Sequence, residues 1–156
     1  MRRILTALLA LAALCAGGCM RVETSLPESL PEKKYATARA VTATIPREQA
    51  LSKLEAVLAR SRMPNGMRLK AKLAPDRLQW AWKLVLPLGN VERHEFDFAY
   101  AEVAPKIVDL SSLGGRIGVK FQKGGADVPY AYLATTSEED AETILDCFAV
   151  LSRPGA

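Results

Sequence analysis

Residues that build metal and catalytic centres are scarce in this sequence. Its 156 residues include three cysteines and one histidine, and it contains no C-x-x-C, H-E-x-x-H or G-x-S-x-G pattern. A structural zinc site takes about four such ligands at suitable spacing, and a nucleophilic triad needs a base beside its nucleophile. The sequence therefore predicts no metal site, no cofactor and no enzyme active site.

The single histidine, His94, alternates with aromatic residues in the stretch "HEFDFAY". On a strand, this spacing places His94 on the same side as Phe96, Phe98 and Tyr100. We therefore expect a histidine at the edge of the core. A hydrolase that uses His94 as its base is a weaker hypothesis, because no nucleophile motif accompanies it.

The sequence also lacks a long apolar run and a strong charge excess. The longest apolar run, residues 4–16, has thirteen residues, whereas a transmembrane helix needs about 20. The chain has 21 basic and 17 acidic residues, and removal of residues 1–18 takes away Arg2 and Arg3. So small a surplus predicts no nucleic-acid partner.

The first eighteen residues have the three-part layout of an export signal. Arg2 and Arg3 form a positive start, the apolar run of residues 4–16 follows, and the segment ends in small residues that include Ala16 and Gly18. We expect cleavage after Gly18. Cys15 would then leave with the signal, and Cys19 would become the first residue of the mature chain.

Residues 16–19, "AGGC", resemble the lipobox of bacterial lipoproteins, with Ala16 at the position where leucine is usual. The resemblance implies a diacylglycerol on the thiol of Cys19 and an acylated amino terminus, for example a palmitate. The residue after the cysteine is Met20 and not the aspartate typical of inner-membrane retention. In a double-membraned bacterium this implies an outer-membrane lipoprotein facing the periplasm. The alternative is a secreted protein in which Cys19 is only the first mature residue.

Residues 19–34 read as the lipidated cysteine and a tether, because they are rich in Pro, Ser and charge and repeat the tetrapeptide SLPE. Residues 35–153 read as one α+β domain. A strand is expected at 38–45, and a helix follows Pro46, with Ala50, Leu51, Leu54, Val57 and Leu58 on its apolar face. Further strands are expected at 67–73, 78–86, 94–100, 106–110, 116–121 and 128–134.

The last element is predicted as a helix over 138–152. Thr136 and Glu139 fit a capping box, and the acidic first turn suits the helix dipole. Its apolar stripe is predicted to be Ala141, Ile144, Leu145, Phe148 and Leu151, with Cys147 beside it as an inert buried thiol.

The expected fold is α+β: an antiparallel sheet of about six or seven strands, with one helix after the first strand and a C-terminal helix. Residues 96–152, a strand followed by hairpins and a capped helix, resemble the bacterial pleckstrin-homology-like pattern. That resemblance implies a curved sheet closed by the C-terminal helix.

Basic residues gather between Arg60 and Arg77, where only Asp76 opposes them. Three of them, Arg68, Lys70 and Lys72, share one face of the strand predicted at 67–73 and form the candidate binding face.

The sequence favours a non-enzymatic envelope lipoprotein that is tethered to a membrane and binds a protein or envelope component. The alternative is that the basic face binds anionic lipid headgroups or lipopolysaccharide.

Overall fold

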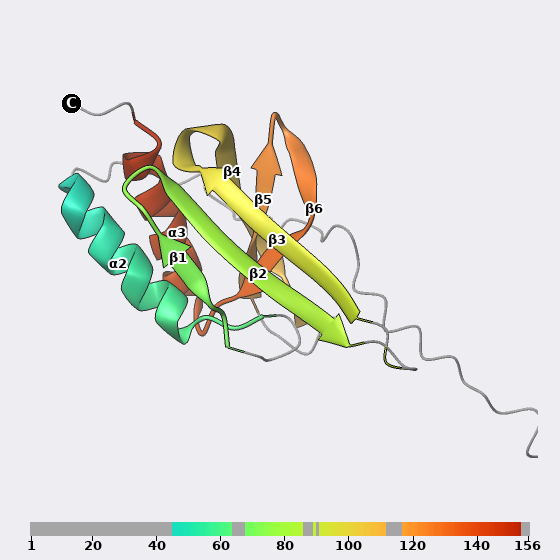
Figure 1. The fold of residues 1–156 in the computed structure, drawn as a ribbon. Coiled ribbons are helices and arrows are strands. Elements are labelled where there is room, and N and C mark those ends of the chain that lie inside the picture. Colours follow the sequence, from blue (N-terminus) through green and yellow to red (C-terminus); the bar gives the residue numbers. More distant parts are fainter. Residues whose placement is uncertain (1–44, 64–67, 86–88, 90, 112–116, 154–156) are drawn as a thin grey trace, which may run out of the picture.

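The fold was analysed in a computed structural model, which describes residues 45–63, 68–85, 89, 91–111 and 117–153. The order of elements is helix, three strands, a short 3-10 turn, three strands and a C-terminal helix (Figure 1). The bounds are α2 Arg47–Arg60, β1 Ala71–Leu73, β2 Arg77–Val85, β3 Val91–Ala99, η2 Tyr100–Glu102, β4 Val103–Asp109, β5 Ile117–Lys123, β6 Ala126–Ala134 and α3 Glu138–Leu151. The α+β class is confirmed.

The strands form two antiparallel sheets, with the orders β1-β2-β3 and β4-β5-β6. The prediction of one sheet was therefore wrong in detail. A single residue of the segment after α2 nevertheless links β6 with the segment that precedes β1: Arg62 bridges Ala134 of β6 and Arg68, which lies three residues before β1. The backbone N–H groups of Arg62 and Ala134 donate to each other's carbonyls at 2.9 and 2.8 Å. A bridge of one residue gives no periodic pattern in the sequence. The sequence therefore indicated the individual strands but not how they divide into two sheets.

The expected strand at 38–45 lies outside the described residues except for Ile45. The prediction that the first helix follows a strand therefore concerns residues that the structure does not describe. The export signal and the tether, residues 1–34, lie outside as well. The strand expected at 67–73 is shorter in the structure, since only residues 71–73 belong to β1. The predicted alternation is present there: Leu69 is buried, Ala71 and Leu73 are half-buried, and Lys70 and Lys72 are exposed.

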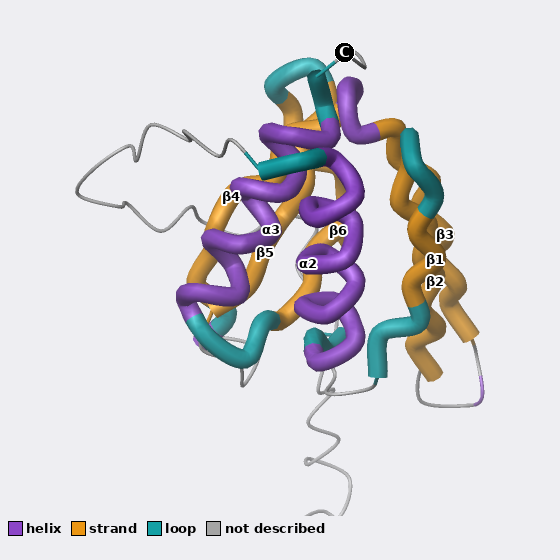
Figure 2. The backbone as a smooth tube through the Cα atoms, turned by 90° about the vertical axis from the view of Figure 1, so that its left-hand side faces the viewer, coloured by secondary structure: helices purple, strands orange, loops and turns teal. Residues whose placement is uncertain are grey.

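The two helices lie side by side, and α3 also packs on β4 and β5 (Figure 2). The predicted apolar faces are those that become buried. In α2 the predicted face is buried except for Leu51, and in α3 the predicted stripe is buried except for Leu145. Both of these leucines are half-buried. Pro46 precedes the first turn of α2, where its missing N–H is not needed.

Aromatic rings fill the space between the two sheets. The Trp80 ring lies 4.9 Å from the Phe96 ring within one sheet and 5.0 Å from the Phe121 ring of the other. Phe121 in turn lies 5.5 Å from Phe148 of α3. The two sheets and the C-terminal helix therefore share one apolar core.

The β5–β6 hairpin and the cap of α3 refine two sequence predictions. Gly124 and Gly125 connect the strands with positive φ angles of 61° and 84°, which is the conformation of a type I′ turn. The N-cap of α3 is Ser137, whose hydroxyl accepts a hydrogen bond from the Asp140 amide at 3.1 Å. The predicted capping box of Thr136 and Glu139 was thus one residue out of register.

Candidate functional site

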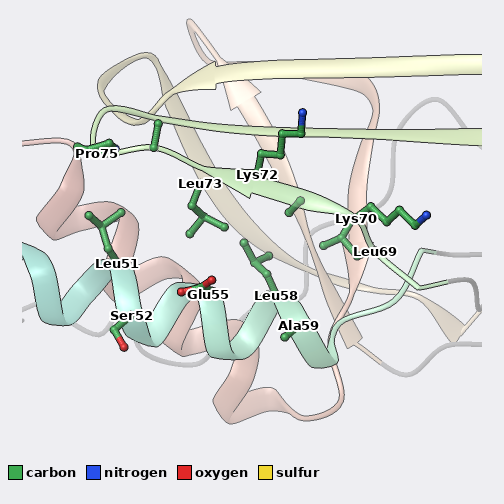
Figure 3. Close-up of a pocket in the computed structure, with 12 residues that line it drawn as sticks. Leu51, Ser52, Glu55, Leu58, Ala59, Leu69, Lys70, Lys72, Leu73 and Pro75 are labelled. Atoms are coloured by element: carbon green, nitrogen blue, oxygen red, sulfur yellow. The ribbon is translucent and has the colours of Figure 1, made fainter.

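A groove of about 870 Å³ separates α2 from β1. This volume lies within the range of about 300–1,000 Å³ that is typical of ligand sites. Leu51 and Leu58 point from the helix toward the strand, and Leu73 points from the strand toward the helix (Figure 3). Its walls are therefore largely apolar. The remaining lining residues are Ser52, Glu55, Ala59, Leu69, Lys70, Ala71, Lys72, Ala74 and Pro75.

The helix is fastened to the strand segment at both ends of this groove. At the N-terminal end of α2, the Arg47 guanidinium donates to the Pro75 carbonyl at 2.6 Å and to the Leu151 carbonyl at 3.0 Å. At the C-terminal end, the chain leaves α2 and Arg62 forms its bridge to Arg68. Because contacts join the two segments at both ends, the groove is bounded along its length.

One side of β1 is unpaired in the described part of the chain, because β1 is the first strand of its sheet. The Ala74 amide donates to the Arg77 carbonyl of β2 at 2.9 Å. In an antiparallel ladder the bonding direction alternates, so the N–H and C=O groups of Lys72 face β2, while those of Ala71 and Leu73 face the open edge. The groove therefore presents directional backbone donors and acceptors as well as apolar side chains.

Lys70 and Lys72 lie at the rim of the groove, with both side chains exposed. Lys72 extends from the strand away from the helix (Figure 3). The same two lysines line a second, smaller hollow of about 410 Å³ on the outer face of β1-β2-β3, together with Glu95 and Asp97. The candidate face predicted from sequence thus adjoins the groove. Arg68 is also exposed, but it lies before β1 and not within it.

Not all of the basic residues predicted as one group belong to this face. Arg60 lies at the end of α2, where its guanidinium binds the Asp140 carboxylate of α3. Arg77 contacts Asp97 at 3.2 Å and Asp76 at 3.4 Å. Asp97 comes from β3 and is distant in sequence, so the sequence could not show that it opposes the basic group.

The carboxylates of the outer face bind other partners. Asp97 accepts hydrogen bonds from Gln79 at 2.9 Å and from Arg77, and Glu95 pairs with Arg93 of its own strand. Among the described residues, neither Lys70 nor Lys72 has an ion-pair partner, although Glu95 and Asp97 line the same hollow. The two lysines therefore leave their ammonium groups exposed beside the edge of β1.

His94 stands at the edge of the core, as predicted. Its ring stacks on Trp82 with a centroid distance of 4.4 Å and lies 4.6 Å from the ring of Tyr130. Its Nε2 is 3.8 Å from the Glu92 carboxylate, which forms an ion pair only if His94 is protonated. Tyr130 belongs to a bulge of β6 and has a positive φ of 59°, uncommon for a bulky residue. This conformation places its ring on the histidine.

Two charge pairs, each with one buried member, were not predicted from the sequence. Asp140, which belongs to the acidic first turn of α3, is 4% exposed and accepts hydrogen bonds from Arg60 Nε at 3.0 Å and from the Thr136 hydroxyl. The hydrogen bond from Arg60 is the main reason that the pKa of Asp140 is lowered. Lys120 is also buried and contacts Asp127 at 2.9 Å. Both pairs join residues of separate elements, so only the fold reveals them.

Cys147 is fully buried beside the α3 stripe, as predicted. Burial is the largest cause that raises the pKa of its thiol to about 11. An attacking thiolate is therefore scarce near neutral pH, which suits a structural role.

In the described ranges, no group of three His, Cys, Asp or Glu residues is placed to hold a metal ion. No helix within those ranges has the length and apolarity needed to span a membrane.

Comparisons of the chain with protein-family models, curated proteins and solved structures find no match. The residues and their geometry therefore carry the functional argument.

Proposed function

We propose that this chain is a non-enzymatic bacterial envelope lipoprotein whose α+β domain is a membrane-tethered binding module for a protein partner or envelope component. The observation that carries the binding role is the α2–β1 groove, which combines apolar walls, a strand edge that no other described strand pairs with, and two exposed lysines. The tether rests on the lipobox-like residues 16–19. In a double-membraned bacterium the module would face the periplasm from the outer membrane.

The tether keeps such a module close to its membrane. Two or three acyl chains at Cys19 would hold it stably, since each buried methylene contributes about 0.8 kcal/mol and one chain alone binds only marginally. The fifteen residues from Met20 to Lys34 span at most about 50 Å when fully extended. A partner of the groove would therefore lie in or near the same membrane.

The tether is tested by the mass of the mature amino terminus and by membrane fractionation, each with and without Cys19→Ser. We expect a lipid-modified Cys19 in the native chain, and release of the Cys19→Ser chain from the membrane fraction. An unmodified Cys19, or unchanged fractionation of the variant, would contradict the lipoprotein proposal.

The groove is tested by a photo-crosslinking residue placed at Ser52, which lines the groove, and in a control at Lys106, which is exposed on β4. We expect an adduct in the native envelope from position 52 only. The adduct should disappear when Lys70→Glu and Lys72→Glu are added. Equal adducts from both positions would contradict a partner that binds at the groove.

A second candidate function is the binding of anionic lipid headgroups or lipopolysaccharide through Arg68, Lys70 and Lys72. It is favoured by the exposure of the three side chains and by the absence of ion-pair partners for the two lysines among the described residues. Each basic residue near an anionic surface contributes about 1 kcal/mol, and salt screens this attraction. Vesicle binding across a salt series tests it, since binding that does not weaken with salt would remove this candidate. The pleckstrin-homology-like resemblance of residues 96–152 stays a prediction beside both functions.

A further inference from the structure

The edge of β1 that no strand of the described ranges pairs with has the features of a site for strand addition. Ala71 and Leu73 direct their backbone N–H and C=O groups away from β2, and α2 forms a wall opposite them. Extended peptides bind to other proteins by adding a strand to such an edge, where the backbone supplies affinity and alternate side-chain sites supply specificity. An acyl chain would fill the apolar groove but would leave these directional groups without partners.

The length of the site is set by the two ends of α2. The open segment runs from Leu69, next to the Arg62–Arg68 bridge, to Ala74, next to the Arg47–Pro75 contact. Six residues of strand extend about 20 Å, and the fourteen residues of α2 rise about 21 Å. The edge of β1 therefore has room for an extended segment of a few residues and not for a long strand or a whole sheet.

The two sides of a strand added at this edge would meet different surroundings. On the helix side, an added strand would contact Leu51, Leu58 and Leu73, which favour apolar side chains. On the outer side, its alternate residues would lie beside Lys70 and Lys72, which are two positions apart, exposed and without an ion-pair partner among the described residues. Opposite charges that face each other across neighbouring strands stabilise the pairing.

We infer that the edge of β1 binds an extended segment of a partner protein, with carboxylate side chains at alternate positions beside Lys70 and Lys72 and apolar side chains between them. This inference deepens the proposed function and rests on its binding role. Lysines on an open edge can also serve only to repel other strands. The two roles differ in outcome, because a protected edge rejects every strand while a binding edge accepts a strand of opposite charge.

The test measures binding of capped peptides to the full chain carrying Cys19→Ser. The probe alternates glutamate and valine over about seven residues. The controls are an alternating lysine and valine peptide and a peptide of the same composition with its glutamates and valines in separate blocks. We expect only the glutamate-valine alternation to bind, and Lys70→Glu with Lys72→Glu to weaken its binding at least about tenfold. The matched variant Lys106→Glu, with the same change on β4, should bind as the unsubstituted chain does.

Backbone methylation of the probe then tests strand addition itself. Methylation of the valine amides should abolish binding if the added strand is antiparallel, and methylation of the glutamate amides should do so if it is parallel, because only one alternate set faces β1. Loss with one set and retention with the other supports the inference. Equal effects of the two sets would overturn it, because binding would then not use the backbone.

The remaining outcomes are also decisive. No binding by any peptide overturns the inference and favours edge protection. Salt-sensitive binding to phosphatidylglycerol vesicles that is lost with the Lys70 and Lys72 changes, without peptide binding, overturns it in favour of a lipid headgroup. The proposed tether is judged separately by the mass at Cys19, so a failed peptide test and a failed tether are distinguishable.

Discussion

Helix α2 has two neighbours, and it meets them differently. Toward α3 its side chains are fully buried and a carboxylate of α3 binds the Arg60 guanidinium at the helix end. Toward β1 it is linked near its two ends, and a groove of about 870 Å³ lies between. The α3 side of the helix thus stabilises the domain, while the β1 side borders a groove with apolar side chains and the outward backbone groups of β1. The following substitutions test this contrast.

The largest expected effect is on stability. Leu54→Ala removes a side chain that is 0% exposed and leaves a cavity, which should lower the free energy of unfolding by about 2–5 kcal/mol. Leu51→Ala, at the half-buried groove wall, should cost less than about 1.5 kcal/mol. Urea unfolding of both variants measures the difference. Equal losses would mean that the groove side is packed as tightly as the α3 side.

Thiol accessibility gives the next contrast. Cys147 is buried with a thiol pKa near 11, whereas a cysteine introduced by Ser52→Cys would lie on the exposed groove side of α2. At neutral pH the thiolate of Cys147 is at least about 100-fold scarcer than that of an exposed cysteine, before access is considered. Alkylation followed by peptide mass mapping should label position 52 in the native state and Cys147 only after unfolding. Rapid native labelling of Cys147 would contradict its burial.

The Arg60–Asp140 pair should have a smaller effect that depends on pH. The pKa of Asp140 is lowered in the folded state, so its ionised form stabilises the fold above the pKa of the unfolded chain, about 3.9. This contribution is lost as the pH falls through the folded-state pKa. Asp140→Asn should therefore destabilise the protein near neutral pH by less than Leu54→Ala does, since half of the Arg60 side chain is exposed.

Unfolding of Asp140→Asn and the unsubstituted chain is compared between about pH 7 and pH 2. We expect the two free energies of unfolding to converge as the acid range is entered. A constant difference over that range would show that the carboxylate charge has no part in joining the helices.

The smallest expected effect on stability belongs to the rim lysines. Lys70→Gln with Lys72→Gln removes two exposed charges without an ion-pair partner among the described residues, so the free energy of unfolding should change by less than about 0.5 kcal/mol. The variant should also stay as monodisperse as the unsubstituted chain in light scattering. Self-association would indicate that the lysines protect the edge and do not serve a ligand.

Much of the architecture was predictable from local periodicity. The stripe of α3 and the alternation of Leu69, Lys70, Ala71 and Lys72 follow from patterns within a few residues. These predictions succeeded because a single element decides which of its faces is apolar.

The site was less predictable because it depends on contacts between distant elements. The sequence predicted Lys70 and Lys72 as part of a charged strand face. It did not predict the groove beside them, because Leu51 has the spacing of a residue on the buried face of the helix. Its position at the margin of that stripe is the only local signal. The opposing Asp97 and the paired Asp140 come from other elements and leave no such signal.

The central claim is that the unpaired edge of β1 is a binding edge, and amide hydrogen exchange at Ala71 and Leu73 tests it most directly. Both amides face away from β2, so they should exchange rapidly in the free chain carrying Cys19→Ser. Saturation with the alternating glutamate-valine peptide should slow both, while the lysine-valine peptide should leave them unchanged. Unchanged exchange of the two amides at saturating glutamate-valine peptide would contradict the claim.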